Sequence, residues 1–237
     1  MNLGSTSTSD RSLSGLALQV LDYEKRLLGG EVFEYFNRDF IALRLALEKH
    51  FGANVTSLSD LYKGAWVGDG ARNTMVVVDC DAVGTTSTLP NRFPSTRQDL
   101  QIGKVYKNAQ GAPYDLVCLL PQAEGGTLVV AYECKHTRMP SSEGPTVNVT
   151  MINEAMTKVL GAGGGNTSPV VLVFISNRLY SDKDKASTTD DLSAALQVGG
   201  SLSHAIIVVR QNCVEYFGPS LARRFKVCVE PEESGVI

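Results

Sequence analysis

Two carboxylates and one ammonium in the middle of the chain have the types and the spacing that phosphodiester hydrolysis requires. Asp115 begins an apolar run that extends to Leu120, and Glu133 and Lys135 end a second run that begins at Thr127. Side chains alternate along a strand, so Glu133 and Lys135 share one face. Carboxylate oxygens are the ligands that Mg²⁺ prefers, and a neighbouring ammonium can position a water for attack. These three residues together predict metal-assisted cleavage.

The segment between the two apolar runs, residues 121–126, is turn-prone and contains Gly125 and Gly126. Such a segment between two strand-like runs predicts a β-hairpin. The hairpin would return Glu133 toward Asp115, so that both carboxylates lie at one edge of a sheet. The competing hypothesis is that Lys135 serves only as an ion-pair partner of Glu133, at a strand end where the sheet meets solvent.

The segments 113–115 (Pro-Tyr-Asp) and 133–135 (Glu-Cys-Lys) resemble the PD-(D/E)XK nuclease motif, with one residue inserted between the proline and the aspartate. The resemblance implies that Asp115 and Glu133 bind Mg²⁺ or Mn²⁺. It implies in addition that Lys135 acts near the attacking water. In this superfamily the acid and the lysine stand at the end of a strand that follows another strand, which is where the sequence places them.

An amphipathic helix is predicted from Glu31 to His50, because its apolar residues recur at spacings of three and four. The resemblance implies that this helix lends an acid to the metal site. Glu34 is the favoured candidate and Glu31 the runner-up. The alternative for Glu34 is an ion pair with Arg38, four residues further along the same helix.

The remaining core elements are a strand over Thr74–Val83, a helix over Thr150–Leu160 and a strand over Pro169–Ser176. Taken with the helix from Glu31 and the hairpin, the order is helix, strand, strand, strand, helix, strand. This is also the core order of the PD-(D/E)XK fold. We therefore expect an α/β fold with a restriction-endonuclease-like central mixed β-sheet flanked by helices, in which the last helix connects two parallel strands.

The ends of the chain are expected to extend this core without adding a second domain, so residues 1–237 form one unit. Residues 1–12 are rich in Ser and Thr, which predicts disorder, and residues 13–30 predict an extra helix. In the tail, the pattern predicts a short helix over Leu192–Gln197 and a strand over Ala205–Val209. Cys213–Phe217 is read as one more strand, and Ser220–Phe225 as a helical turn.

Other residue groups compete for a functional role. Asp79 and Asp81 share a face of the strand over Thr74–Val83, but solvent exposure explains them more simply. Cys134 and His136 would share the strand face opposite Glu133, yet nothing marks an activated thiol, and packing explains the cysteine better. The basic segment that includes Lys104 and Lys107 is a candidate for phosphate contact, with a solvated surface as the favoured reading.

Composition narrows the classes of function. The hydrophobic content of 43% and the charged content of 20% are those of an ordinary globular protein, and the net charge of −3 gives no basic footprint for nucleic acid. The five cysteines form no CxxC pair, which predicts reduced thiols in an intracellular setting. No apolar run reaches the roughly 18 residues that a membrane span requires.

The prediction is therefore a Mg²⁺- or Mn²⁺-dependent nuclease, with DNA favoured over RNA as the substrate. Within the superfamily, the Tyr132–Lys135 segment and the aromatic helix before it are similar to the nuclease-like domains of Crinkler-type effectors, without their amino-terminal targeting motif. That likeness implies a host cell, and the nucleus within it. The alternative is a catalytically silent module that keeps the nuclease fold and acts through protein or nucleic-acid partners.

Overall fold

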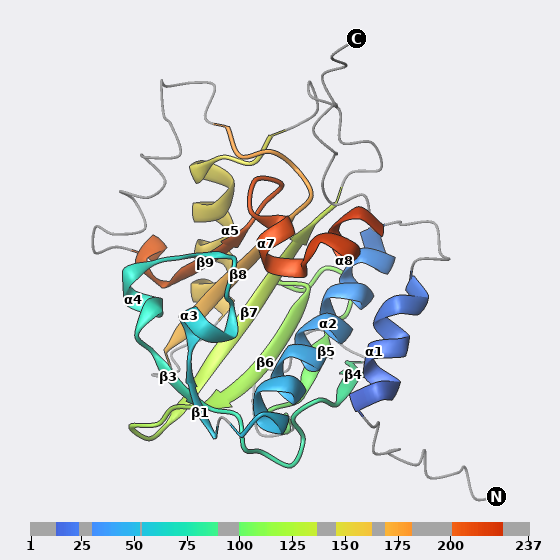
Figure 1. Cartoon of the computed structure of the whole chain (residues 1–237). Helices are drawn as coiled ribbons and strands as arrows, with labels where there is room; N and C mark the ends of the chain where they lie inside the picture. The colour runs from blue at the N-terminus through green and yellow to red at the C-terminus, as the bar shows by residue number, and fades with distance from the viewer. Residues whose placement is uncertain are drawn as a thin grey trace, which may run out of the picture.

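The structure is a computed structural model, and it describes residues 13–23, 30–52, 54–89, 100–136, 146–162, 169–181 and 201–224. The disorder expected over residues 1–12 and the short helix expected over Leu192–Gln197 lie outside these residues. The protein is a mixed α/β structure in which helices cover a large mixed sheet (Figure 1).

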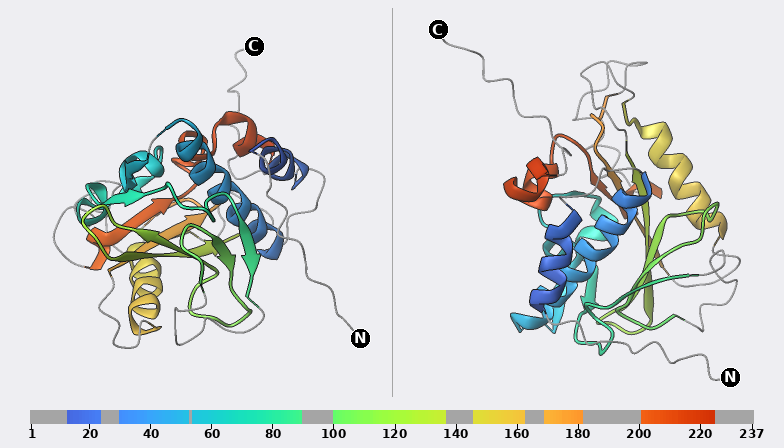
Figure 2. Two further views of the ribbon diagram at one scale, coloured as in Figure 1. Left: turned by 90° about the horizontal axis from the view of Figure 1, so that it is seen from below. Right: turned by 90° about the vertical axis from the view of Figure 1, so that its right-hand side faces the viewer.

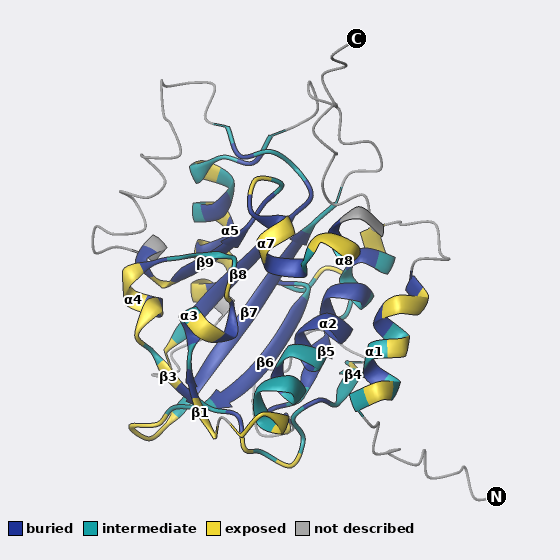
Figure 3. Ribbon diagram, viewed as in Figure 1, coloured by how far each residue is buried: buried dark blue, intermediate teal, exposed yellow. Residues whose placement is uncertain are grey.

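The central sheet has seven strands in the order β2-β9-β8-β7-β6-β5-β4. Their bounds are β2 (Trp66–Val67), β9 (Ala205–Val208), β8 (Val170–Ser176), β7 (Thr127–Lys135), β6 (Leu116–Pro121), β5 (Val105–Lys107) and β4 (Thr86–Thr88). The pairs β4–β5, β7–β8 and β8–β9 are parallel, and the other neighbouring pairs are antiparallel. The central strands β6 to β9 are buried except at some of their end residues (Figure 3).

The predicted hairpin is confirmed as β6 and β7. Its register pairs Leu116 with Tyr132 at one end and Pro121 with Thr127 at the other. The turn uses Gly125 and Gly126 at φ 99° and 89°, a backbone conformation that other residues rarely adopt. The register therefore brings the residue before β6 alongside the carboxyl end of β7.

Helices lie on both faces of the sheet. Helix α2 (Gly30–His50), with α1 (Leu13–Asp22) beside it, covers one face, and α5 (Val149–Ala162) covers the other (Figure 2). Because strand residues alternate, Val130 and Tyr132 pack with the aromatic residues of α2, whereas Val129 and Ala131 pack with α5. Helix α5 is the predicted connection between the parallel strands β7 and β8.

One core strand was assigned wrongly from the sequence. The segment Thr74–Val83 contains only the three-residue strand β3 (Met75–Val77), which pairs with β1 (Val55–Ser57) in a separate two-stranded sheet. The strand beside β6 in the central sheet is β5, within the segment that was read as basic surface. An apolar run indicates a strand but does not identify its partner, which is the physical reason for the error.

A second correction concerns Cys213–Phe217, which forms helix α7 and not a strand. Its burial follows a helical period: Cys213, Tyr216 and Phe217 are buried, whereas Val214 and Glu215 are exposed. The predicted helical turn after it is α8 (Pro219–Arg224). The remaining short helices are α3 (Leu58–Leu61), α4 (Asp69–Arg72) and η3 (Ser201–His204).

Three thiols agree with expectation, because Cys80, Cys118 and Cys134 are free. Among the described residues, none of the helices combines the length and the apolar character needed to cross a bilayer.

Candidate functional site

Asp115 is held at the start of β6 by two hydrogen bonds to β7. Its backbone N–H donates to the carbonyl of Tyr132 at 2.9 Å, and its Oδ2 accepts from the backbone N–H of Cys134 at 2.7 Å. The ladder that pairs Leu116 with Tyr132 places Asp115 opposite Glu133. Two strands thus fix two carboxylates at one end of the hairpin, as the sequence predicted.

Glu133 and Lys135 form an ion pair with each other at the carboxyl end of β7. Glu133 is only 6% exposed, whereas the side chain of Lys135 is 38% exposed. Burial alone would lower the pKa of Lys135, but the hydrogen bond and the charge of Glu133 outweigh it, and the net shift is upward. Lys135 is therefore a fixed cation with its ammonium partly in solvent.

The Asp115 carboxyl has a pKa raised to about 7, first because it is buried and second because Glu133 repels its charge. The N–H of Cys134 and the charge of Lys135 act in the opposite direction and are outweighed. Within the described residues Asp115 forms no ion pair. We refer to Asp115, Glu133 and Lys135 as the Asp115 cluster; it contains two carboxylates and one cation, and an additional cation would relieve the repulsion.

The other predicted ligand, Glu34, is engaged elsewhere. Its Oε2 lies 3.0 Å from Nζ of Lys107, a buried lysine on β5. Lys107 is in register with Leu116, whose side chain faces α2, so it meets the helix directly. The ion pair of Glu34 with Arg38, the alternative from the sequence, is wrong, because Arg38 pairs with Asp39, with Nε 2.7 Å from Oδ1.

Glu31, the runner-up, is 72% exposed at its side chain and lies 3.8 Å from Nζ of Lys107. Glu34 still raises the pKa of Asp115 through its charge, although less than burial and Glu133 do. Helix α2 thus brings acidic charge near Asp115, while the Glu34 carboxylate itself is held by Lys107.

The Asp115 cluster supplies two of the ligands that a Mg²⁺ ion requires. In the part of the chain that the structure describes, no group of three or more His, Cys, Asp or Glu side chains is placed to hold one ion. Mg²⁺, however, usually binds one or two carboxylates and keeps several waters or substrate oxygens as its other ligands. Asp115 and Glu133 satisfy that pattern, and the raised pKa of Asp115 marks a carboxylate that a bound cation would stabilise in its charged form.

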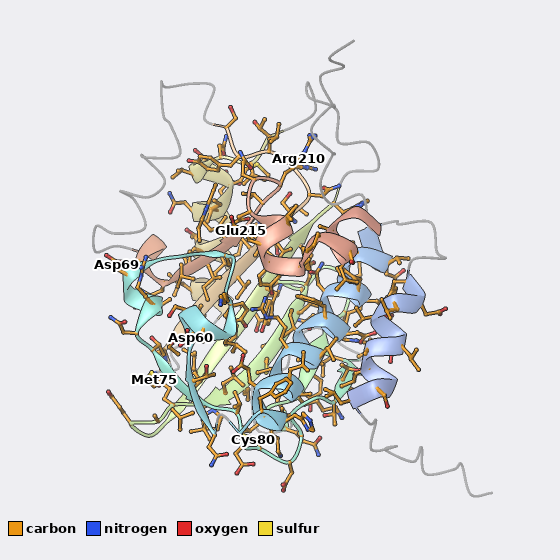
Figure 4. The ribbon with its side chains drawn as sticks, viewed as in Figure 1. Asp60, Asp69, Met75, Cys80, Arg210 and Glu215 are labelled. Carbon is orange, nitrogen blue, oxygen red and sulfur yellow. The ribbon has the colours of Figure 1, made fainter. Side chains whose placement is uncertain are left out.

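The competing sequence candidates do not assemble into a site. Asp79 pairs with Lys49 at 3.5 Å, and Asp81 is exposed. Both flank Cys80, which Figure 4 places near the carboxyl end of α2, at the other end of the sheet from the Asp115 cluster. They are surface acids, as favoured from the sequence.

The thiol-histidine alternative is also unsupported by the geometry. Burial raises the pKa of the Cys134 thiol well above its ordinary value, so the thiolate that a nucleophile requires is disfavoured. The ring of His136 packs on Phe33, with centroids 5.0 Å apart. Burial also lowers the pKa of His136. Both side chains serve the contact between β7 and α2.

Sequence reasoning missed a cavity beside the Asp115 cluster. Its volume is about 310 Å³, and its polar lining is Glu31, Glu34, Lys107, Asn108, Gln110 and Asp115. The available signal was a lysine and an asparagine directly after the apolar pair Val105–Tyr106, which is the pattern of a strand that ends in polar groups. Lys107 is 7% exposed, so the solvated-surface reading of this residue is wrong.

Comparisons with protein-family models, with curated proteins and with solved structures give no match to this chain.

Proposed function

We propose that this protein is a Mg²⁺- or Mn²⁺-dependent nuclease with a PD-(D/E)XK-type fold. The observation that supports the proposal is the pairing of Asp115 with Glu133 across two hydrogen-bonded strands, with the Lys135 ammonium adjacent to Glu133. The sequence of β5, β6, β7, α5 and β8, with a parallel β7–β8 pair, is compatible with the core of that fold.

In the proposed mechanism, Asp115 and Glu133 hold the metal ion. When bound, such an ion polarises a phosphodiester and lowers the pKa of a coordinated water. Lys135 orients the attacking water with its ammonium and balances charge that develops on the phosphate. Glu34 contributes negative charge near Asp115 and is assigned no ligand role while Lys107 holds it.

The substrate class follows from the resemblance and from the charge of the protein. With a net charge of −3, binding rests on local contacts near the site and not on a general attraction to polyanions. DNA remains the favoured substrate, and the host nucleus remains the setting that the Crinkler-type likeness implies.

The decisive experiment is a gel assay on single- and double-stranded DNA and RNA, with and without Mn²⁺. Glu133→Gln and Lys135→Met should each reduce metal-dependent cleavage by roughly 10²- to 10³-fold, because each removes a group that acts on the reacting atoms. Glu124→Gln in the hairpin turn and Lys158→Met on α5 are matched controls, since both side chains are exposed. Unchanged cleavage in the Glu133 variant would overturn the assignment.

A catalytically silent binding module is the second candidate. It is favoured by the internal pairing of the acids, because Glu133 has Lys135 and Glu34 has Lys107. Calorimetric titration with Mn²⁺ separates the two. A nuclease binds the ion, and Asp115→Asn weakens that binding; a silent module gives no heat in either protein.

A further inference from the structure

Lys107 is a buried ammonium that lies between two acids of α2 at the edge of the proposed metal site. Its Nζ is 3.0 Å from Oε2 of Glu34, 3.8 Å from Oε1 of Glu31 and 5.0 Å from the centroid of the Tyr35 ring. Burial alone would lower the pKa of Lys107, but the hydrogen bond and the charge of Glu34 outweigh it, so the pKa is raised. Lys107 therefore stays charged at neutral pH and holds the Glu34 carboxylate.

The backbone fixes this ammonium beside Asp115. Lys107 is the last residue of β5 and is in register with Leu116 of β6, the residue that follows Asp115. The backbone N–H of the next residue, Asn108, donates to the carbonyl of Asp115 at 2.7 Å. Two hydrogen-bonded strands thus set the position of Lys107 relative to the proposed metal ligand, and the ion pair sets the position of Glu34 relative to both.

Glu34 lies near the metal site without belonging to it. Glu34 and Asp115 line the same cavity of about 310 Å³, and the charge of Glu34 is one of the causes that raise the pKa of Asp115. Among the residues that the structure describes, Glu34 nevertheless does not form a group of three possible ligands with Asp115 and Glu133. Its side chain is 23% exposed, and the contact that holds its carboxylate is the ion pair with Lys107.

We propose that Lys107 is a positioning residue that competes with the metal ion for the Glu34 carboxylate. While the ion pair is intact, the protein offers the ion two carboxylates, from Asp115 and Glu133; without Lys107, Glu34 supplies a third. This inference rests on the proposed function, because it requires a metal ion at Asp115. The sign of the effect distinguishes it from a structural role: loss of a structural residue weakens metal binding, whereas loss of Lys107 strengthens it.

Calorimetric titration of the protein with Mn²⁺ tests this proposal without a cleavage assay. Lys107→Met keeps most of the length of the side chain and removes its charge. It should lower the dissociation constant for Mn²⁺ by roughly tenfold or more, because it frees a carboxylate ligand and removes a like charge. Lys107→Arg keeps the cation and should bind Mn²⁺ as the wild type does. An unchanged or weaker affinity in folded Lys107→Met, or an equal gain in Lys107→Arg, overturns the proposal.

A matched pair of double variants separates a new ligand from a change in charge. Lys107→Met/Glu34→Gln and Lys107→Met/Glu31→Gln have the same formal charge, and each removes one of the two acids that Lys107 contacts. The gain in affinity should vanish with Glu34→Gln and persist with Glu31→Gln. Water-proton relaxation should also show fewer waters on the Mn²⁺ ion in Lys107→Met than in the wild type. Equal gains in both double variants, or an unchanged number of waters, contradict the role assigned to Glu34.

Glu34→Gln alone is a second route if Lys107→Met does not fold. Because the held carboxylate is not a ligand, this variant should weaken Mn²⁺ binding by no more than roughly fivefold through its lost charge. A larger loss would show that Glu34 already binds the ion, and it would overturn the proposal.

The outcomes for Lys107 and for the nuclease function can be told apart. Mn²⁺ binding by the wild type with no gain in Lys107→Met removes the role of Lys107 and leaves the nuclease standing. Binding by Lys107→Met but not by the wild type supports the competition and identifies the wild type as a silent module. No binding by either protein removes both proposals.

Discussion

Asp39 and Asp115 are both carboxylates withdrawn from bulk water, yet their surroundings differ in nearly every polar contact. Asp39 is fully buried on α2, where its Oδ1 accepts from Nε of Arg38 at 2.7 Å. Its Oδ2 accepts from Nε2 of Gln19 and from the hydroxyl of Tyr23, each at 2.6 Å. We refer to these four residues as the Asp39 network. Asp115 accepts one backbone N–H and faces a second carboxylate.

The difference separates a structural charge from a candidate functional one. The Asp39 network gives its carboxylate a cation and two further donors, and in doing so it fastens α1 to α2. Buried ions are tolerated under these conditions. The Asp115 cluster leaves one carboxylate destabilised, as its pKa of about 7 indicates. Perturbed groups of this kind are concentrated at functional sites, which is the reason for assigning chemistry to Asp115 and packing to Asp39.

The largest effect on stability is expected from Asp39→Asn. The substitution keeps the shape but leaves the Arg38 guanidinium, 10% exposed, without its counter-ion. The free energy of unfolding should fall by about 3 kcal/mol, measured by urea denaturation. Cleavage by the remaining folded protein should not change. A fall in cleavage at temperatures where the variant is folded would mean that the Asp39 network also serves the site.

A smaller effect of opposite sign is expected from Asp115→Asn. The folded-state pKa of Asp115 is about 7 and its ordinary value is 3.8, so the native state holds a proton that the unfolded state has lost between these pH values. The contribution of this carboxyl to the free energy of unfolding therefore falls as the pH rises from about 4 to 7. It is lowest above pH 7, where the buried group is charged in the folded state. The variant should be more stable than the wild type by about 2 kcal/mol at pH 8.

The advantage of Asp115→Asn should shrink as the pH falls and disappear near pH 4. Asparagine can still accept a hydrogen bond from the N–H of Cys134, so the two proteins differ in the charge at this position and not in this hydrogen bond. The measurement is the difference in unfolding free energy between the two proteins from pH 4 to 8. The contributions of the other acids to the pH dependence are the same in both proteins and cancel in this difference. A wild type that is more stable than the variant at pH 8 would contradict the proposed strain on Asp115.

The sequence predicted one half of this contrast better than the other. Asp115 and Glu133 were brought together correctly because two long apolar runs flank a glycine turn, and a hairpin of that length has one sensible register. Asp39 gave no signal, because two of its three partners, Gln19 and Tyr23, come from an earlier segment of the chain. The local pattern of apolar residues identifies helices and strands. Whether a buried charge has a partner depends on which of these elements pack against each other.

The shortness of some strands, and pairing between distant segments, explain the remaining errors. Strand β5 has three residues, too few for a period to be recognised, and Lys107 was therefore read as surface. Lys107 is buried and paired with Glu34 because a neighbouring strand and a helix from much earlier in the chain surround it. The run after Thr74 was a recognisable strand, but its pairing with β1 was not encoded in its own residues.

The smallest expected effect is the stabilisation of the folded protein by a bound metal ion, which should depend on Asp115 and not on Asp39. An ion that binds only the folded protein at ten times its dissociation constant raises the unfolding free energy by about 1.4 kcal/mol. Mn²⁺ should give this gain to the wild type and to Asp39→Asn, because the Asp39 network is not a ligand set. Asp115→Asn should lose it. In the wild type the gain should diminish below pH 7, where Asp115 takes up a proton and competes with the ion. An equal gain in all three proteins would place the ion away from Asp115, and both carboxylates would then be structural.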